Sequence, residues 1–310
     1  AIEGKELDKL NTQQLRAHVR TISVYARVSP QHKLDILNAL KDNGEIVAMS
    51  GDGVNDAPAL KAAHVGIAMG KVGTDVAREA ASIVLADDQF STIVAAIREG
   101  RRIYDNIRKF VVFLLRANFD ELIFVMTTLL LGMPLPYLPI HILWLNLMTD
   151  GLPALALGME KAEPDIMDRP PRDPEEHILS GEMPRLVIAA LLGFAIVFLY
   201  FLWKISSGVS VEHARTVTLT LAINIELLMA YSIRSRKNIW EIGFFSNKWL
   251  VGATLIPFLM QVIILITPLR DIFHFTMITS REWVEVIVFA SVGFITFEML
   301  KLFPDDVVSV

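Results

Sequence analysis

Residues 49–58, MSGDGVNDAP, place two aspartates, an asparagine and two glycines directly behind a short apolar run. Glycines allow the backbone to turn sharply and to approach a ligand closely. The carboxylates of Asp52 and Asp56 provide the oxygen ligands that Mg²⁺ prefers. The stretch therefore predicts a magnesium site.

Residues 49–58 are also open to interpretations other than a magnesium site. Asp52 and Asn55 could simply cap the helix that follows. A calcium-loop pattern requires glycine at the sixth position counted from Asp52, where Ala57 stands, and the G-x-G-x-x-G pattern is broken at Asp56. Magnesium binding and helix capping therefore both remain open.

A second group of polar side chains lies inside long apolar segments. A charged residue at the bilayer centre costs about 2.5–3.5 kcal/mol on the insertion scale, so each is expected to face protein and to have a partner. Carboxylate, amide and carbonyl oxygens are ligands of Ca²⁺, or of Na⁺ where fewer charges are present. The group comprises Asn118, Asp120, Glu121, Asn146, Thr149, Asp150, Asn224 and Glu226.

Helical spacing brings some of these residues onto common faces. Asn118 and Glu121 share one face, and Asn146, Thr149 and Asp150 share another. These faces could bind a cation. Alternatively, the residues could form hydrogen-bonded pairs that only hold membrane helices together.

Two details refine the expected cation site. Asp120 points about 100° away from Glu121 around the helix, so no role is assigned to it. Gly151 and Pro153 should weaken the helix directly after Asp150. Carbonyl oxygens freed in this way can coordinate a cation.

The acidic loop requires a scaffold, and the first ninety residues indicate one. Short apolar runs alternate with stretches of helical character, including one that Ser29 and Pro30 should begin. This alternation predicts an α/β domain with a Rossmann-type parallel sheet, whose ligands gather at the carboxyl ends of the strands. The expected strands are SVYARV (23–28), EIVAMS (45–50), VGIAMG (65–70) and SIVLAD (82–87).

A single long helix is predicted from Ser91 to Leu131, because this segment contains no proline and only one internal glycine, Gly100. At 1.5 Å per residue it would be about 60 Å long, twice the hydrocarbon thickness of a bilayer. Its first half is charged, and its second half, from Phe110, is apolar enough to span. Residues 91–109 would therefore form a stalk.

The composition also indicates a membrane protein. Of 310 residues, 53% are hydrophobic, more than a soluble domain of this length usually contains. The net charge of −5 argues against a nucleic-acid partner, and the absence of cysteine excludes disulfides and thiolate metal sites.

We expect an all-α bundle of six transmembrane helices over residues 110–303, followed by a cytoplasmic tail at 304–310. The five spans after the first are expected near 140–158, 184–204, 214–233, 249–267 and 284–303. The loops 159–183 and 234–248 contain more Lys and Arg than the opposite loops. The positive-inside rule then places the soluble domain in the cytoplasm.

Two motifs carry a resemblance to a known family. MSGDGVNDAPALKAAHVGIAMG closely resembles the hinge and phosphorylation-domain signature of P-type ATPases. LWLNLMTDGLPALALG, together with DIMDRPPR, resembles the sixth membrane helix and the following loop of the calcium-transporting subgroup. The resemblance covers essentially the whole chain. It implies the carboxyl-terminal half of a sarco/endoplasmic-reticulum-type calcium pump or a bacterial relative.

The resemblance also implies an organisation. Residues 1–90 would be the carboxyl-terminal part of a haloacid-dehalogenase-like phosphorylation domain, and the bundle would hold membrane helices five to ten. The short loop at 205–213 favours a bacterial or simplified relative, which would lie in the plasma membrane.

Site residues follow from the resemblance by position. Asp52 would bind catalytic Mg²⁺, Lys33 in ARVSPQHK would contact the transferring phosphoryl group, and Asn55 and Asp56 would complete that pocket. In the membrane, one full Ca²⁺ site would comprise Asn118, Glu121, Thr149, Asp150 and Glu226. Part of a second would comprise Asn146 and Asp150.

The chain departs from the family pattern in what it lacks. The Asp-Lys-Thr-Gly-Thr motif with the phosphorylated aspartate does not occur in the sequence. The actuator and nucleotide-binding domains and the first four membrane helices are also missing, so ATP would be bound mainly by that amino-terminal half. This half and membrane lipid are the expected partners, and the chain alone is expected to be inactive.

The expected function is therefore ATP-driven Ca²⁺ transport through an aspartyl-phosphate intermediate. A Na⁺ or H⁺ pump of the same superfamily remains an alternative. A channel or a transporter not driven by ATP would explain the membrane carboxylates but would leave GDGVND without a purpose. A structural membrane subunit would tolerate replacement of these carboxylates by amides.

Overall fold

The computed structural model describes residues 1–173 and 175–302, which form two compact units. The first unit comprises residues 1–99 and 169–171, and the second comprises the rest of the described chain. The predicted tail at 304–310, and residue 303 of the last predicted span, lie outside the described residues.

The first unit contains a parallel three-stranded sheet in the order β3 (Ala48–Gly51), β4 (Val65–Met69) and β5 (Ile83–Leu85). Helix α4 (Ala57–Ala62) connects β3 to β4, and α5 (Asp75–Ala80) connects β4 to β5. The predicted parallel α/β arrangement is confirmed for these strands.

The run at 23–28 was predicted to belong to the same parallel sheet as the other three runs, and this prediction was wrong. Only Tyr25–Ala26 forms a strand, β2, and it pairs with β1 (Ile2–Glu3) in a separate parallel sheet. With two residues in each strand, this sheet has few ladder bonds, so side-chain packing must hold it. Helices α1 (Gly4–Leu7), α2 (Thr12–His18) and α3 (Pro30–Asp42) supply a small apolar cluster beside it.

Helix α3 begins as its sequence predicts. Ser29 accepts a hydrogen bond from the His32 amide at 3.2 Å, and Pro30 occupies the first helical position, where a missing N–H does no harm. The helix thereby presents Lys33 from its first turn.

Helix α6 (Phe90–Leu130) is continuous over 41 residues, as the sequence predicted. Its last part carries Arg116, Asp120 and Glu121 within otherwise apolar sequence. These charges set α6 apart from the other membrane candidates.

Within the described chain, five helical segments are long and apolar enough to cross a membrane. The first, Pro139–Leu157, consists of α7 (Pro139–Trp144), a π-helical segment η2 (Leu145–Asp150) and α8 (Gly151–Leu157). The others are α9 (Met183–Ser206), α10 (Val211–Ile233), α12 (Lys248–Ile266) and α14 (Ser280–Leu300). The protein is thus a multi-pass membrane protein, and a sixth crossing by α6 stays a prediction.

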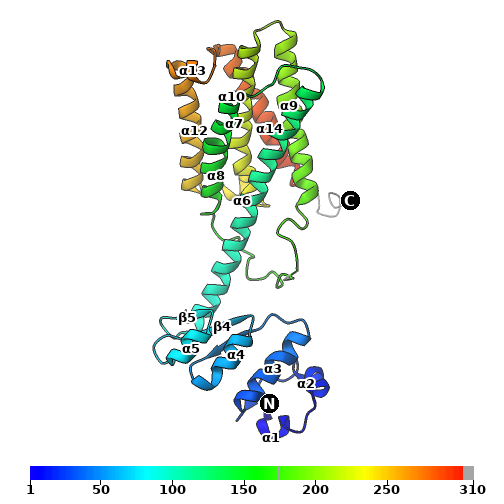
Figure 1. Cartoon of the computed structure of the whole chain (residues 1–310), viewed down its shortest axis with the longest axis vertical. Helices are drawn as coiled ribbons and strands as arrows, with labels where there is room; N and C mark the ends of the chain where they lie inside the picture. Colours follow the sequence, from blue (N-terminus) through cyan, green and yellow to red (C-terminus); the bar gives the residue numbers. More distant parts are fainter. Residues whose placement is uncertain (174, 303–310) are drawn as a thin grey trace. The chain divides into compact units, whose positions relative to one another are not determined.

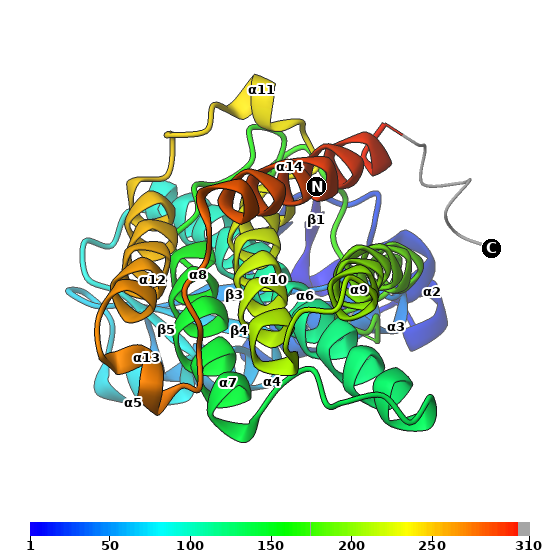
Figure 2. The same ribbon diagram turned by 90° about the horizontal axis from the view of Figure 1, so that it is seen from above.

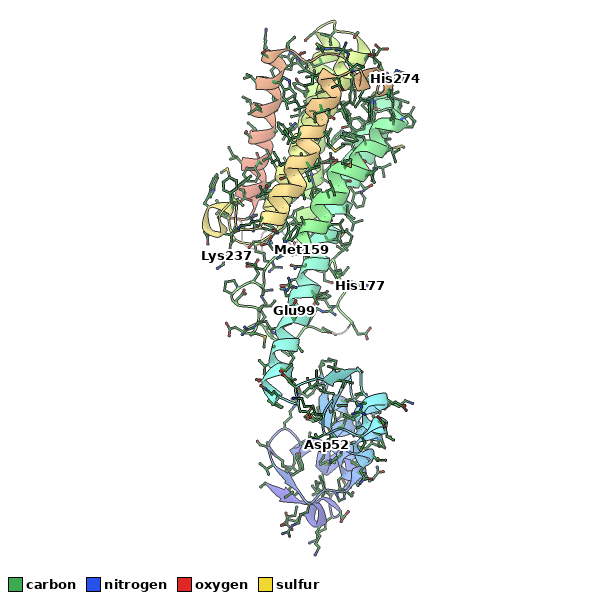
Figure 3. The ribbon with its side chains drawn as sticks, turned by 90° about the vertical axis from the view of Figure 1, so that its left-hand side faces the viewer. Asp52, Glu99, Met159, His177, Lys237 and His274 are labelled. Carbon is green, nitrogen blue, oxygen red and sulfur yellow. The ribbon has the colours of Figure 1, made fainter. Side chains whose placement is uncertain are left out.

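Helix α10 is the centre of the second unit. It is buried along most of its length, and α9, α12, α14 and η2 pack around it (Figures 1 and 2). Two short helices, α11 (Ile239–Ile242) and α13 (Leu269–Ile272), lie in the connections on either side of α12. Met159 and Lys237 lie at one end of the bundle and His274 at the other (Figure 3).

Candidate functional site

The loop after β3 is organised around Asp56. Lys33 Nζ lies 2.5 Å from Asp56 Oδ1, while Asp56 Oδ2 accepts hydrogen bonds from the backbone amides of Asp52 at 3.2 Å and Gly53 at 3.1 Å. Asp56 is buried, and a side chain at Gly51 would collide with it. The loop is therefore folded tightly around one carboxylate.

The charge state of Asp56 follows from these contacts. Burial raises the pKa of its carboxyl, but the hydrogen bonds from Lys33 and from the Gly53 and Asp52 amides outweigh that effect. The pKa of Asp56 consequently lies below its ordinary value. Asp56 is thus a fixed anion that positions Lys33.

Asp52 and Asn55 remain exposed beside this anchored carboxylate. The capping interpretation fails for both, because Gly53 precedes the short 3₁₀ helix η1 (Val54–Asp56) and Asp56 precedes α4. Four residues of α3 and this loop were predicted to form the site: Lys33, Asp52, Asn55 and Asp56. Of these, Lys33 and Asp56 form an ion pair in the structure. The structure leaves the Asp52 carboxylate at the carboxyl end of β3, where a metal could reach it.

These residues suit Mg²⁺ as a partial ligand set. Magnesium is commonly held by one or two carboxylates, with phosphate and water completing its coordination. The exposed Asp52 carboxylate could supply one such ligand, whereas both oxygens of Asp56 are already engaged.

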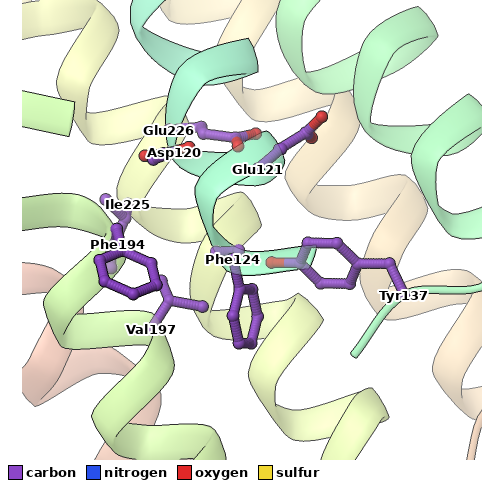
Figure 4. A pocket seen from close by; sticks show the side chains of 9 residues that line it. Asp120, Glu121, Phe124, Tyr137, Phe194, Val197, Ile225 and Glu226 are labelled. Carbon is purple, nitrogen blue, oxygen red and sulfur yellow. The ribbon is translucent and has the colours of Figure 1, made fainter. Parts of the chain in front are cut away.

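A pocket in the second unit collects three carboxylates. Asp120 and Glu121 of α6 and Glu226 of α10 gather at one side of it, and Phe124 and Tyr137 are among the aromatic residues lining the rest (Figure 4). Glu121 and Glu226 are buried. The structure therefore brings together two of the predicted cation ligands.

Helix α10 and η2 meet at the Thr149 hydroxyl. Its Oγ1 lies 3.0 Å from Glu226 Oε2 and 2.8 Å from the carbonyl oxygen of Leu145. Asp150, the next residue, is buried, as is Thr149. One further predicted ligand, Thr149, thus adjoins the Glu226 carboxylate, and Asp150 follows it directly in the chain.

Several of these carboxylate oxygens lack hydrogen-bond partners within the described chain. Both oxygens of Asp150 and Oε1 of Glu121 are buried without a donor. Buried polar atoms are nearly always hydrogen-bonded, and leaving one without a partner is costly. The arrangement is typical of a site that a ligand or another segment completes.

Asn118 and Asn146 are the exposed members of the predicted set. Asn118 Nδ2 donates to the carbonyl of Leu114 at 2.8 Å, and Asn146 Nδ2 donates to that of Ile142 at 3.0 Å. The Asn146 amide also interacts with the Glu121 carboxylate. Among the described residues, no group of three acidic or histidine side chains is close enough to hold a metal.

The predicted helix break after Asp150 was misplaced. Helix α8 continues through Gly151 and Pro153, and the irregularity is the π-helical η2 that ends at Asp150. Pro153 has no N–H to donate to the Thr149 carbonyl, which explains why the regular ladder is disturbed on its amino-terminal side. Such π-helical segments are frequent at functional sites.

Sequence reasoning missed the partner of Asp120. Arg116 is fully buried, and its Nη2 lies 2.7 Å from Asp120 Oδ2. The guanidinium also lies over the Phe297 ring at 5.1 Å, and a side chain at Gly193 would collide with the pair. The i, i+4 spacing of opposite charges was the signal that could have revealed it.

Comparisons with known proteins match both parts of the chain that contain these residues. Residues 134–303 match the model of the family described as "Cation transporting ATPase, C-terminus". Residues 9–64 match haloacid dehalogenase-like hydrolase. The second match covers Lys33 and the acidic loop, and the first covers every proposed cation ligand after α6.

Curated relatives match almost the whole chain. It is 44% identical to a "Calcium-transporting ATPase" of Bacillus subtilis over 92% of its length, which is 32% of that protein. It is 43% identical to "Calcium-transporting ATPase 1" of Bacillus cereus (96% of the chain, 36% of the relative). It is 40% identical to "Probable cation-transporting ATPase F" of Mycobacterium bovis (94% and 32%). The chain thus spans about a third of the length of the relatives it matches. It belongs to the cation-transporting P-type ATPase family.

Proposed function

We propose that this chain is the membrane and partial phosphorylation portion of an ATP-driven Ca²⁺ pump. The observation that carries the proposal is the buried Asp150 carboxylate, which has no hydrogen-bond donor in the described chain and belongs to the residue directly after Thr149, whose hydroxyl contacts Glu226. The printed names of the Bacillus relatives support Ca²⁺ as the transported ion.

In this proposal, Ca²⁺ is the substrate of the second unit. Glu121, Thr149, Asp150 and Glu226 would supply oxygen ligands from three helical segments, and Asn118 would add an amide oxygen. Asn146 and Asp150 would contribute to a second site. A helix outside this chain would complete that second site.

The first unit would act on the phosphoryl group. Asp56 would hold the Lys33 ammonium in position, where it offsets negative charge on the phosphoryl oxygens during transfer to an aspartate outside this chain. Asn55, exposed in the same loop, would contact that group. Asp52 would hold Mg²⁺, which would supply further charge neutralisation.

The proposed topology has six membrane crossings, and α6 is the first. The start of α6 and the end of α14 then lie on the same side of the membrane. Met159 and Lys237, which belong to the Lys- and Arg-rich loops at 159–183 and 234–248, lie at the same end of the bundle (Figure 3). The positive-inside rule supports a cytoplasmic location for this end. We assign the protein to the plasma membrane.

ATP hydrolysis by the full-length protein containing this segment tests the proposal, with Ca²⁺ and Na⁺ titrated separately at fixed Mg²⁺. We expect stimulation by micromolar Ca²⁺ and no sodium requirement. Stimulation by Na⁺ alone would reassign the ion, and cation flux without ATP hydrolysis would indicate a channel or secondary transporter.

A further inference from the structure

One residue after α8, Glu160, contacts helices α6, α10 and α12 of the second unit through its main-chain oxygen and its carboxylate. The main-chain oxygen of Glu160 accepts hydrogen bonds from α6, at 2.8 Å from Asn106 Nδ2 and 3.0 Å from Arg102 Nη1. Its carboxylate accepts from Arg234, at the end of α10, and from Asn247, at the start of α12. Glu160 itself lies three residues beyond the end of α8.

The Glu160–Arg234 ion pair is buried and bidentate. Arg234 Nη2 lies 2.9 Å from Glu160 Oε1, and Arg234 Nε lies 3.1 Å from Oε2. Arg234 is 1% exposed and Glu160 8%. Arg234 also donates to Ser246 Oγ at 2.7 Å and to the Gly243 carbonyl at 3.2 Å. A planar, fully partnered pair of this kind fixes geometry as well as charge.

Asn247 extends the junction to α8 and α12. Its Oδ1 caps α12 by accepting from the amides of Trp249 and Leu250 at 3.0 and 3.1 Å. Its Nδ2 donates to Glu160 Oε2 at 2.9 Å and lies 3.2 Å from the Ala156 carbonyl of α8. The ends of α8, α10 and α12 therefore meet at the Glu160 carboxylate.

Helix α6 contacts the same loop through main-chain oxygens. Besides its bonds to Glu160, Asn106 Nδ2 donates to Gly158 at 3.1 Å, and Arg101 Nη1 donates to Ile166 at 2.7 Å. These bonds depend on the path of the loop backbone rather than on its side chains. Any change in that path would alter how α6 is held.

We propose that Glu160 is a positioning residue that couples movement of α6 to the helices carrying the other cation ligands. Helix α6 carries Glu121, α10 carries Glu226, and Asp150 directly precedes α8. A rigid loop anchored at Glu160 makes these segments shift together. This inference rests on the proposed function, since coupling is defined only for a pump.

The experiment compares Glu160→Gln and Arg234→Gln with Arg236→Gln in the full-length protein reconstituted into liposomes. Arg236 is a matched control, because it lies two residues further on and pairs at 3.0 Å with Glu182, while its side chain is 64% exposed. We measure Ca²⁺ uptake, ATP hydrolysis and equilibrium Ca²⁺ binding on the same preparations.

In both test variants, we expect Ca²⁺ uptake per ATP hydrolysed to fall below the wild-type ratio, because the helices that carry the cation ligands no longer shift together with α6. Equilibrium Ca²⁺ affinity should remain unchanged, because no proposed ligand is altered. Arg236→Gln should retain the wild-type ratio. An unchanged ratio in the test variants, with or without a lower yield of folded protein, overturns the inference.

A double variant covers the case in which single variants do not fold. Replacing both Glu160 and Arg234 by Leu leaves no unpaired buried charge, and such replacements are often tolerated. We expect this double variant to fold and to take up less Ca²⁺ per ATP hydrolysed than the wild type. A double variant with the wild-type uptake per ATP overturns the inference. If the wild-type protein itself shows no ATP-dependent Ca²⁺ uptake, the proposed function has failed instead.

Discussion

At the scale of single residues, the two aspartates of the GDGVND loop have different roles although they are only four positions apart. Asp56 is buried and engaged with Lys33 and two backbone amides. Asp52 is exposed at the end of β3. Residue type and spacing alone indicated that both carboxylates could bind Mg²⁺. The difference arises from the backward turn of the loop, which only the folded backbone reveals.

This difference predicts the effect of Asp52→Asn in the full-length protein. We expect turnover to fall by at least about 100-fold, as it does when a group that stabilises transition-state charge is removed. The thermal unfolding midpoint should be retained, because the Asp52 side chain is exposed. ATP hydrolysis and thermal unfolding measured on one preparation check both parts. Retained hydrolysis would refute the metal role.

The Arg116–Asp120 pair leads to a second prediction at this scale. Asp120→Asn leaves a buried guanidinium without its counter-charge, and breaking a buried pair typically costs about 3–5 kcal/mol. The double variant Arg116→Met, Asp120→Asn should recover most of that stability. Thermal unfolding of the purified full-length protein measures both. If the single variant is as stable as the wild type, the pair does not hold the membrane unit together.

At the scale of elements, η2 connects sequence to site. Its six residues from Leu145 to Asp150 carry Asn146, Thr149 and Asp150, and Pro153 lies less than one turn beyond its end. A regular helix would direct the Thr149 carbonyl to an N–H at position 153, which proline lacks. The widened turn is therefore encoded locally, and it shapes the part of the chain that carries half of the six predicted cation ligands.

Pro153→Ala in the full-length protein tests this role. Restoring an N–H donor favours a regular helix in place of η2. We therefore expect the Ca²⁺ concentration for half-maximal ATPase stimulation to rise roughly 2- to 10-fold. This change corresponds to the net free energy of one hydrogen bond, about 0.5–1.5 kcal/mol. Pro257 lies inside α12 and is also buried, so Pro257→Ala is the matched control. Equal shifts in both variants would count against a specific role for η2.

How much the sequence could predict differs between elements. The long helix α6 and the strands β3 to β5 followed from apolar periodicity and from breakers such as Pro and Gly. The pairing of Tyr25–Ala26 with Ile2–Glu3 did not, because two-residue strands leave almost no pattern. The position of η2 and the burial of Arg116 also depended on packing between segments far apart in the sequence, which a single sequence does not encode visibly.

At the scale of the whole molecule, the number of membrane crossings decides on which side of the membrane the first unit and each loop of the bundle lie. Five segments are apolar enough to cross, and α6 is set apart by three charges in its apolar half. Two of those charges, Arg116 and Asp120, pair with each other, and Glu121 is buried. Pairing and burial lower the cost of placing these residues in a bilayer, which supports a sixth crossing.

Single cysteines can count these crossings, since the chain has none of its own. We would introduce them at four exposed positions, Val72, His177, Trp240 and Met277, in a full-length protein whose other cysteines are replaced by serine. A membrane-impermeant maleimide should label Met277→Cys in intact cells. The other three should react only in inverted vesicles, and Val217→Cys, fully buried in α10, should stay unlabelled in both.

The parity of the crossings makes the result decisive for α6. If α6 and the following segment Pro139–Leu157 both cross, Val72 and His177 lie on the same side. If only Pro139–Leu157 crosses, they lie on opposite sides, and Val72→Cys is then labelled in intact cells while His177→Cys is not. That outcome would remove α6 from the membrane. It would also separate Glu121 from Asp150 and Glu226, so the proposed cation site would fail together with the six-span topology.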